Sequence, residues 1–358
     1  MDTALTSGEP QDVEGRLDAA VKLCAPGTAL RHALDMIIAG HLGALVCIGD
    51  TENVLAAGDD GFKLDISFTA NRLFELSKMD GAIVVDRDLT RILRANFHLN
   101  PDPSLPTTET GMRHRTAARM SLLTKAVVIS VSQRRQVVNV FVGGHSYQLR
   151  TVAELMVSVN QLLVSLQNTR TQLDRGLLRL TTLELDDCVT MRDVADTFYL
   201  FELLTTEASE LDLLIVQLGS EATTITMQRD EFIGGMDEEY TLMIRDYARD
   251  SSKENVEAIR KKFHEMRNGE MRSAKSVAKV LGYEDRAEDS VMAPLGLRTL
   301  NNISVVRKGM ADKIVDEYGS LRDLLRDIED NPGRLDSLGV KNPDILADSL
   351  YRMGGKRS

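Results

Sequence analysis

The sequence predicts an α/β protein in which an N-terminal domain, a mixed sheet flanked by helices, precedes an all-helical middle domain and a C-terminal domain of helical hairpins. Three observations indicate this architecture. Short β-rich segments alternate with helical patterns over residues 1–150, apolar residues recur at helical spacing from Thr151 onward, and short helices punctuated by glycine begin at about Pro294. We therefore expect domains at residues 1–150, 151–290 and 291–358, which a chain of 358 residues is long enough to fill.

Helices and strands alternate in the N-terminal domain. Apolar residues share one face of an expected helix over residues 30–43, which should end at Gly43. A second helix should begin after Thr69, a residue type that caps helices, and lead directly into Asp80. Strands are expected in the β-rich segments ALVCIGD, AIVVD, RILRANFHL, AVVISVS and QVVNVFVGG.

The middle domain is expected to be a helical spacer or bundle. From Val152 to Leu180, apolar residues recur at steps of three, four or seven, which predicts a long amphipathic helix with a coiled-coil-like stripe. Further helical patterns cover residues 187–204, 239–250 and 255–266. Such stripes are usually packing surfaces, and we find no candidate chemistry among these residues.

The C-terminal domain contains two similar units in tandem. Each has apolar residues, a tight polar turn and a helix that begins two or three residues later, in the segments SVVRKGM and LGVKNPD. This pattern predicts a repeated helix-turn-helix hairpin.

Composition and charge narrow the classes of function. No apolar run approaches the ~20 residues that span a bilayer, and the first residues lack the pattern of a secretory signal, so we expect a cytoplasmic protein with no membrane partner. Cys24, Cys47 and Cys188 are far apart and suggest neither a disulfide framework nor a zinc site. The net charge of −11 argues against a protein that coats nucleic acid. Residues 294–358 differ, with eleven Lys and Arg against ten Asp and Glu, a net of +1.

A cationic cluster, Arg113-His114-Arg115, lies where a helix is expected to begin. The helix dipole disfavours positive charge on a first turn, so the cluster breaks a local rule, and such violations tend to mark functional sites. Free N–H groups and guanidinium groups together would cradle a polyphosphate. The alternative is an exposed basic cluster that pairs with Glu109, Asp86 or Asp88.

The tripeptide Asp80-Gly81-Ala82 precedes a strand and has two interpretations. It is either a turn, in which Gly81 supplies backbone freedom, or a carboxylate that binds Mg²⁺ or Mn²⁺ or takes a proton from a hydroxyl, beside residues small enough for a nucleotide to approach. The second suits phosphoryl or nucleotidyl transfer, which needs an acid and cations. The chain has neither a GxxxxGK[ST] loop nor a GxGxxG motif.

Several segments together closely resemble the DNA-integrity scanning diadenylate cyclases (the DisA family). They are GALVCIGD, KMDGAIV, RANFHLNPDPSLPTTETGMRHRTAAR and VISVSQRR, and the resemblance extends over the whole chain. It implies a cyclase domain, a helical linker and a C-terminal helix-hairpin-helix domain. The implied reaction condenses two ATP into cyclic di-AMP and releases two pyrophosphates, with two cyclase domains face to face. It also implies a homo-oligomer, at least a dimer and in this family an octamer.

The resemblance assigns roles to individual residues. Asp80 would bind Mg²⁺ or Mn²⁺ and help to deprotonate the 3′-hydroxyl. The remaining positions divide into those that line the ribose and phosphates (Gly81 and Ala82), those that hold phosphates (Arg113, His114, Arg115 and Thr116), and those near the adenine or elsewhere in the nucleotide site (Leu99, Ser132 and Gln133). Two positions depart from the family pattern. Met112 replaces a threonine and removes one possible phosphate hydrogen bond, and Gln133 replaces an acid, which puts rate or metal preference in question.

The resemblance also implies that the C-terminal hairpins bind branched DNA, through Arg307, Lys308, Gly309, Gly339 and Lys341, and that the protein associates with the nucleoid. Lys341 stands where such hairpins usually carry a second glycine, and a net charge of +1 predicts weak, salt-sensitive binding. The alternative is a degenerate module kept for packing or for protein contact. A second hypothesis for the whole chain is a DNA-junction-binding scaffold that binds ATP or cyclic di-AMP with little catalysis. We expect the oligomer and any coupling to DNA to be built on the helical stripe that begins at Val152.

Overall fold

The computed structural model describes residues 10–284, 287, 289–307, 309–328, 331, 334–335, 338–340 and 342–353. Two compact units make up the chain: Met1–Asn160 with Asp212–Thr226, and Gln161–Leu211 with Met227–Ser358. Two long helices, α6 (Val152–Leu185) and α7 (Met191–Leu218), have residues in both units. The division into domains at residues 150 and 290 stays a prediction.

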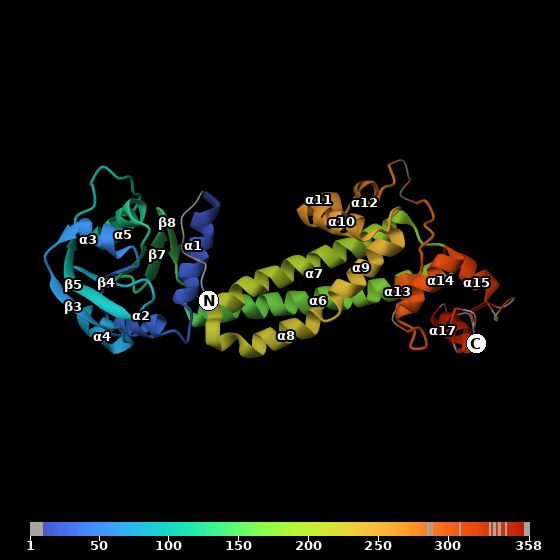
Figure 1. Cartoon of the computed structure of the whole chain (residues 1–358), viewed down its shortest axis with the longest axis horizontal. Helices are drawn as coiled ribbons and strands as arrows, with labels where there is room; N and C mark the ends of the chain where they lie inside the picture. Colours follow the sequence, from blue (N-terminus) through green and yellow to red (C-terminus); the bar gives the residue numbers. More distant parts are fainter. Residues whose placement is uncertain are drawn as a thin grey trace. The chain divides into compact units, whose positions relative to one another are not determined.

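The first unit is built on a mixed sheet, as predicted (Figure 1). Strands β1 (Ala44–Ile48) and β4 (Ala82–Val85) are parallel, and the other pairings are antiparallel. The order is β2-β5-β4-β1-β6-β7-β8, with β3 paired to β5. The remaining strands are β2 (Gly58–Asp59), β3 (Phe62–Ser67), β5 (Arg91–Leu99), β6 (Val127–Val131), β7 (Val138–Val142) and β8 (His145–Gln148).

The central strands are continuous apolar runs because helices cover both faces of the sheet. Alternate residues of β1 enter different cores: Ala44, Val46 and Ile48 pack with helices on one face, and Leu45 and Cys47 with helices on the other. The first face is covered by α1 (Pro10–Leu23), α2 (Ala29–Ala39) and α4 (Ala70–Leu76), and the second by α3 (Thr51–Ala56) and α5 (Met112–Leu123).

Two expected helix boundaries had different outcomes. Thr69 caps α4 as predicted, since its hydroxyl accepts a hydrogen bond from the Arg72 N–H at 3.2 Å. The prediction that the preceding helix ends at Gly43 was wrong, because α2 ends at Ala39. Gly40 forms the C-cap and His41 takes a left-handed φ of 53°, so the chain turns three residues before Gly43.

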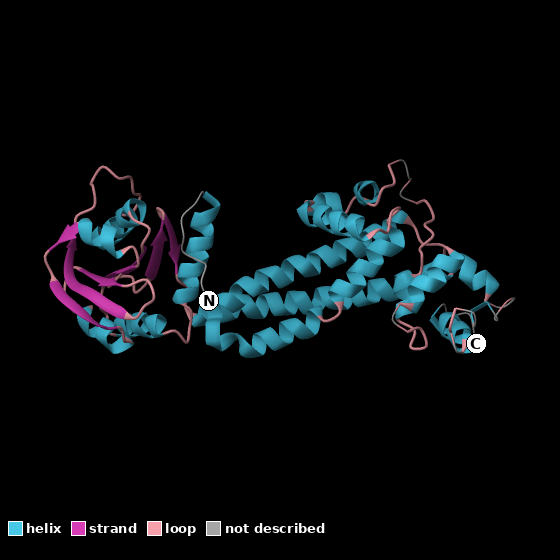
Figure 2. Ribbon diagram, in the orientation of Figure 1, coloured by secondary structure: helices cyan, strands magenta, loops and turns pink. Residues whose placement is uncertain are grey.

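The second unit is helical (Figure 2). Helix α6, which begins in the first unit and continues in the second, confirms the predicted amphipathic stripe. Leu155, Val159, Leu166, Leu173, Leu177 and Leu180 of α6 are all buried. Helix α7 extends to Leu218, well beyond the pattern that ended at residue 204. The helices that follow are η1 (Gly219–Ala222), α8 (Thr223–Ile233), α9 (Met236–Tyr247), α10 (Lys253–Glu265), α11 (Asn268–Met271) and α12 (Ala274–Val280).

The C-terminal helices share one core, which also takes in Leu185 of α6. They are α13 (Leu297–Asn301), α14 (Met310–Tyr318), α15 (Leu321–Asp327) and α17 (Pro343–Met353). Gly309, with a φ of 78°, directly precedes α14, and Gly339, with a φ of 90°, lies four residues before α17. Glycine tolerates these left-handed backbones without strain.

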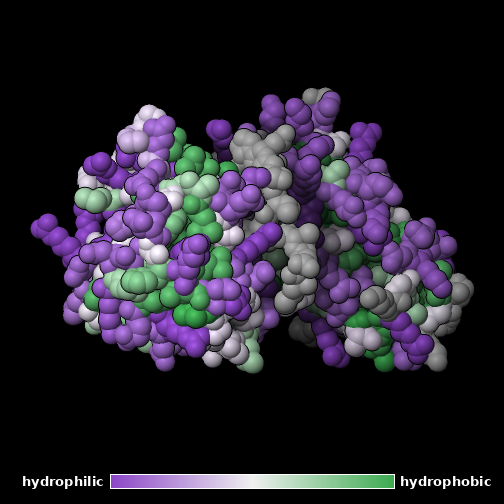
Figure 3. Space-filling model, turned by 60° about the vertical axis from the view of Figure 1, so that its left-hand side comes forward, coloured by the Kyte–Doolittle hydropathy of each residue, from purple (hydrophilic) through white to green (hydrophobic). Residues whose placement is uncertain are grey.

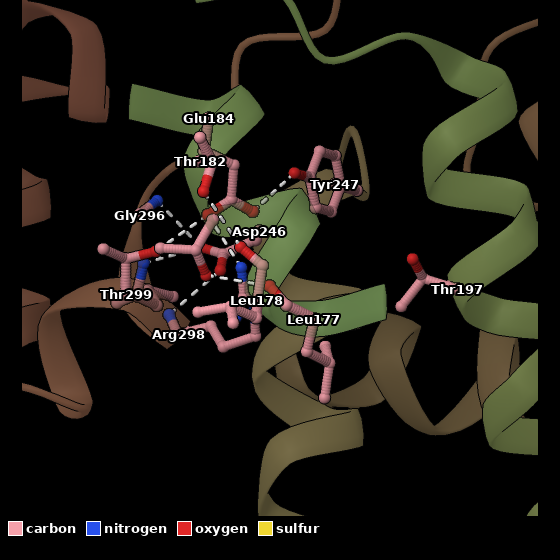
Figure 4. A network of polar contacts seen from close by, with 12 residues as sticks. Leu177, Leu178, Thr182, Glu184, Thr197, Asp246, Tyr247, Gly296, Arg298 and Thr299 are labelled. Atoms are coloured by element: carbon pink, nitrogen blue, oxygen red, sulfur yellow. Dashed lines mark hydrogen bonds and ion pairs between the residues drawn. The ribbon is translucent and has the colours of Figure 1, made fainter. Parts of the chain in front are cut away.

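A buried polar cluster joins α6, α9 and α13 inside the second unit (Figure 4). Glu184 accepts hydrogen bonds from Arg298, Thr299 and the Tyr247 hydroxyl at 2.6–2.8 Å. The Asp246 carboxylate accepts the backbone N–H groups of residues 296–298 at 2.6–2.9 Å and so satisfies the first turn of α13. Buried charges are tolerated where they are paired in this way.

Hydrophilic residues form most of the face drawn in Figure 3. Across the described residues, no helix is both long and apolar enough to cross a membrane.

Candidate active site

A cavity of about 730 Å³ opens on the first unit and brings the two sequence motifs together. Its walls come from the start of β4, the end of β5, the first turn of α5 and the end of β6. Nine of the predicted site residues line it: Asp80, Gly81, Ala82, Leu99, Arg113, His114, Thr116, Ser132 and Gln133. The cavity volume lies in the range of about 300–1,000 Å³ that is typical of ligand sites.

Asp80 lies on the turn that enters β4, with its side chain 93% exposed. Gly81 has a φ of 86°, so the turn needs the backbone freedom of glycine. The interpretation of this tripeptide as a turn is therefore correct, and it is compatible with a functional carboxylate at the same residue. In the described part of the chain, the recorded partner of the carboxylate is Arg113, whose Nη2 lies 3.5 Å from Oδ1.

Helix α5 presents its N-terminus to the cavity. Gly111 is the N-cap, and no side chain of the described residues accepts a hydrogen bond from the first turn. Gly111, Met112 and Arg113 all line the cavity. The free N–H groups and the positive end of the helix dipole therefore favour an anion at this position.

Arg113 and Arg115 take different positions although they are two residues apart. Arg113 and Thr116, one turn apart, both reach the cavity. Arg115 is exposed and does not line the cavity. Within one chain, Arg113, His114 and Thr116 of the motif therefore line the cavity, and Arg115 lies on the outer surface.

The surroundings of His114 favour its neutral form. Burial lowers its pKa below the usual value; the charge of Glu109 opposes this, while Arg135 and Arg113 lower it further. Nδ1 lies 3.3 Å from the Oγ of Ser130, and the ring packs edge-on against Phe141 with centroids 6.2 Å apart. With Nδ1 engaged by Ser130, the other ring nitrogen is the one available to a ligand.

Other lining residues were missed in the sequence. Arg134 adds a second guanidinium to that of Arg113, and its signal was the pair of arginines that directly follows Gln133. Leu45 and Phe97 add apolar wall next to Leu99, but buried strand residues of this kind give no functional signal in a sequence. Ser130, which contacts His114, is hidden in the same way inside an apolar run.

The site contains one carboxylate suited to a metal. Among the described residues no group of three His, Cys, Asp or Glu side chains could hold an ion. Mg²⁺ commonly binds through one or two carboxylates together with waters and substrate phosphates. An exposed Asp80 beside an uncapped helix N-terminus therefore fits a divalent ion that arrives with a nucleotide.

The residues predicted to bind DNA are partly described. Arg307 is exposed, and Gly309 and Gly339 lie in the two turns that precede α14 and α17. A Cβ atom added at Gly339 would be 4.0 Å from the Cε of Met310, so the two turns lie close together. Lys308 and Lys341 lie outside the described residues.

Comparison with known proteins gives the class of this site. Residues 31–146 match the DAC family, described as the DisA bacterial checkpoint controller nucleotide-binding region. Residues 149–290 match the DisA bacterial checkpoint controller linker region. The protein is a diadenylate cyclase, a nucleotidyltransferase.

Curated relatives identify the family. A DNA integrity scanning protein DisA from Symbiobacterium thermophilum is 39% identical over 92% of this chain and 93% of its own length. Another, from Streptomyces avermitilis, is 35% identical over 97% and 94%. The chain belongs to the DisA family. A solved structure of DacA from Staphylococcus aureus covers 38% of this chain and 89% of its own, with 20% identity and a TM-score of 0.29.

Proposed function

We propose that this protein condenses two molecules of ATP into cyclic di-AMP with release of two pyrophosphates, and that the cavity around Asp80 and Arg113 binds one ATP. The observation that carries the proposal is the meeting, in one cavity, of an exposed carboxylate, a guanidinium and an uncapped helix N-terminus. These are the groups that transfer of a nucleotidyl group requires, because the reaction depends on positioning and on compensation of phosphate charge.

The triphosphate would lie at the N-terminus of α5. Backbone N–H groups of the first turn, the Arg113 guanidinium and the Thr116 hydroxyl would donate to its oxygens. The neutral His114 ring would donate from the nitrogen that Ser130 does not engage. The base would lie against the apolar wall that includes Leu99, with Ser132 and Gln133 at its edge.

Asp80 would hold the divalent metal, Mg²⁺ or Mn²⁺, which neutralises charge on the reacting phosphate when it is bound. The same carboxylate would accept the proton of the attacking 3′-hydroxyl, either directly or through a water molecule. Its exposure supports this role, since the reacting partner is carried by a second nucleotide that must approach from outside the cavity.

The reaction requires two such sites. Each 3′-hydroxyl attacks the α-phosphate of the other ATP, so two cyclase domains would face each other and a monomer would be inactive. We therefore propose a homo-oligomer of at least two chains and, by family resemblance, an octamer. Arg115, exposed on α5 outside the cavity of its own chain, would be available at that interface.

The link to DNA is the second part of the proposal. The chain's relatives are named DNA integrity scanning proteins. The paired turns before α14 and α17 would bind the backbone of branched DNA as helix-hairpin-helix modules, with Arg307, Lys308 and Lys341 adding charge. DNA binding would then regulate synthesis of cyclic di-AMP, in the cytoplasm and at the nucleoid.

Asp80→Asn separates binding from turnover. The substitution keeps the shape of the side chain but removes the base and the metal ligand, so we expect formation of cyclic di-AMP to fall at least 100-fold while the Kd for ATP changes by less than about fivefold. Asp88→Asn, which changes an exposed acid at the other end of β4, is the control and should leave both quantities unchanged. Normal product formation by the Asp80→Asn protein would refute the role of Asp80.

A further inference from the structure

The strand opposite Asp80 contains an irregularity. Strand β5 pairs with β4 through Ala82 and Phe97, and then through Val84 and Arg94. Two residues along β4 thus correspond to three along β5, which defines a β-bulge between these pairs. Asn96 lies in this bulge with a φ of 52°, a left-handed conformation that asparagine adopts more readily than most residues.

The side chain of Asn96 reaches back to the turn that carries Asp80. Its Nδ2 donates a hydrogen bond of 2.8 Å to the backbone carbonyl of Asp80. The Asp80 side chain is 93% exposed, so packing does little to fix its direction. The position of the carboxylate therefore depends on the backbone of the turn, and the Asn96 amide is bonded directly to that backbone.

The turns that contain Gly81 and Gly61 both pack closely against the backbone of this bulge. A Cβ atom added to Gly81 would be 2.8 Å from the carbonyl carbon of Asn96 and 2.9 Å from the Phe97 nitrogen. A Cβ atom added to Gly61 would be 2.7 Å from the carbonyl oxygen of Ala95 and 2.8 Å from that of Asn96. The backbone of the bulge is thus in close contact with the turn 80–81, and its shape limits where that turn can lie.

We propose that Asn96 is a positioning residue for the cyclase reaction. Its left-handed backbone builds the bulge against Gly81, and its amide fixes the carbonyl of Asp80, so that the carboxylate is aimed at the metal and at the attacking hydroxyl. Bulges are frequent beside active sites because they redirect a side chain. The inference rests on the role proposed above for Asp80.

Asn96→Gly is the informative substitution. Glycine accepts the same φ without strain, so the bulge should persist while the amide is lost. We expect kcat to fall about tenfold, which corresponds to the loss of one hydrogen bond of about 1.4 kcal/mol, with the KM and Kd for ATP unchanged within twofold. The midpoint of thermal unfolding should move by no more than a few degrees.

Asn96→Asp makes the test sharper. Aspartate tolerates the left-handed backbone, but it places an acceptor against the Asp80 carbonyl where a donor stood, so kcat should fall further than in Asn96→Gly. Gln136→Gly is the matched control, since Gln136 also has a positive φ, 54°, and does not line the cavity. This control should keep the wild-type kcat.

The outcomes distinguish this inference from the proposed function. If the wild-type protein makes no cyclic di-AMP, the proposed function itself fails. If the wild-type protein is active and Asn96→Gly keeps the wild-type kcat, the positioning role is refuted. An Asn96→Gly protein that loses both ATP affinity and thermal stability would also refute the positioning role, because such a loss would show that Asn96 has a general structural role. A fall in kcat alone, deeper in Asn96→Asp, supports it.

Discussion

The guanidinium of Arg113 lies where it does because residue 43 has no side chain. A Cβ atom at Gly43 would be 2.4 Å from Nη1 and 3.1 Å from Cζ of Arg113. Gly43 does not have a left-handed φ, so other residue types could adopt its backbone conformation. Glycine is needed at this position because the Arg113 guanidinium leaves no room for a side chain. The residue that leads into β1 thus makes room for the main cation of the site.

Gly43→Ala should therefore weaken ATP binding without unfolding the domain. The flexible end of Arg113 can move away from the new methyl group, so we expect the Kd for ATP to rise about three- to tenfold, with a small change in thermal stability. Titration with a non-hydrolysable ATP analogue measures this. Gly15→Ala is the control, since nothing lies within 4 Å of that position on α1, and it should stabilise the helix by up to about 1 kcal/mol. Equal Kd values for Gly43→Ala and wild type would contradict the argument.

For individual residues, the sequence motifs identified the charged groups of the site but not the residues that position them. Asp80 and Arg113 stand out because they break local rules or precede a strand. Asn96 and Gly43 give no such signal, since one acts through a bulge and the other through a clearance between segments far apart in the chain. Arg115 belongs to the motif but does not line the cavity of its own chain.

Among the elements, the long helices and central strands were predicted, and the short strands β3 and β8 were not. Apolar runs and a repeating stripe identified β1, β4, β6 and α6 because burial imposes those patterns. Strand β8 has the polar sequence HSYQ and carries no apolar pattern, whereas β3 is mostly exposed although its sequence FKLDIS alternates apolar and polar residues. Their pairing with β5 and β7 is decided by the tertiary structure.

The contact of Asp246 on α9 with the first turn of α13 predicts that the stability of the second unit depends on pH. Burial and the nearby Glu184 raise the pKa of Asp246 to about 7. An unfolded aspartate titrates near 3.9, so between about pH 4.5 and 7 the folded state binds more protons than the unfolded state. The free energy of unfolding should therefore fall as pH rises through this window, by up to about 1.4 kcal/mol per pH unit.

Asp246→Asn should remove this dependence, because the amide does not titrate. Urea unfolding of the second unit's helices at pH 5, 6 and 7 measures it. Glu257→Gln changes an exposed acid on α10 and should retain the wild-type slope. A slope in Asp246→Asn equal to that of the wild type would show that Asp246 is ionised throughout the window.

At the scale of the whole molecule, α6 and α7 each have residues in both compact units. One unit contains the cavity around Asp80 and Arg113, and the other contains the C-terminal helices with the turns at Gly309 and Gly339. The buried cluster of Glu184, Asp246 and Arg298 fixes the start of those helices to α6 and α9. Glu184, which contacts Arg298 of the C-terminal helix α13, thus belongs to a helix that has residues in both units.

Arg307→Glu tests the proposed DNA contact. We expect affinity for a four-way junction to fall at least tenfold at 50 mM salt, and the effect of junction DNA on cyclic di-AMP synthesis to disappear, with basal synthesis unchanged. Lys261→Glu, which reverses the charge of an exposed residue of α10, controls for net charge. Unaltered junction binding by Arg307→Glu would remove Arg307 from the interface.

The main proposal is that two facing cavities, each with Asp80, Arg113 and one bound ATP, join two ATP molecules into cyclic di-AMP. Its most direct test is incubation of the purified wild-type protein with ATP and Mg²⁺ or Mn²⁺, with products resolved by chromatography and identified by mass. We expect the products to be cyclic di-AMP and pyrophosphate, with two pyrophosphates for each molecule of cyclic di-AMP. ATP that is bound but not converted would contradict it, and would instead indicate a scaffold that binds nucleotide and DNA without catalysis.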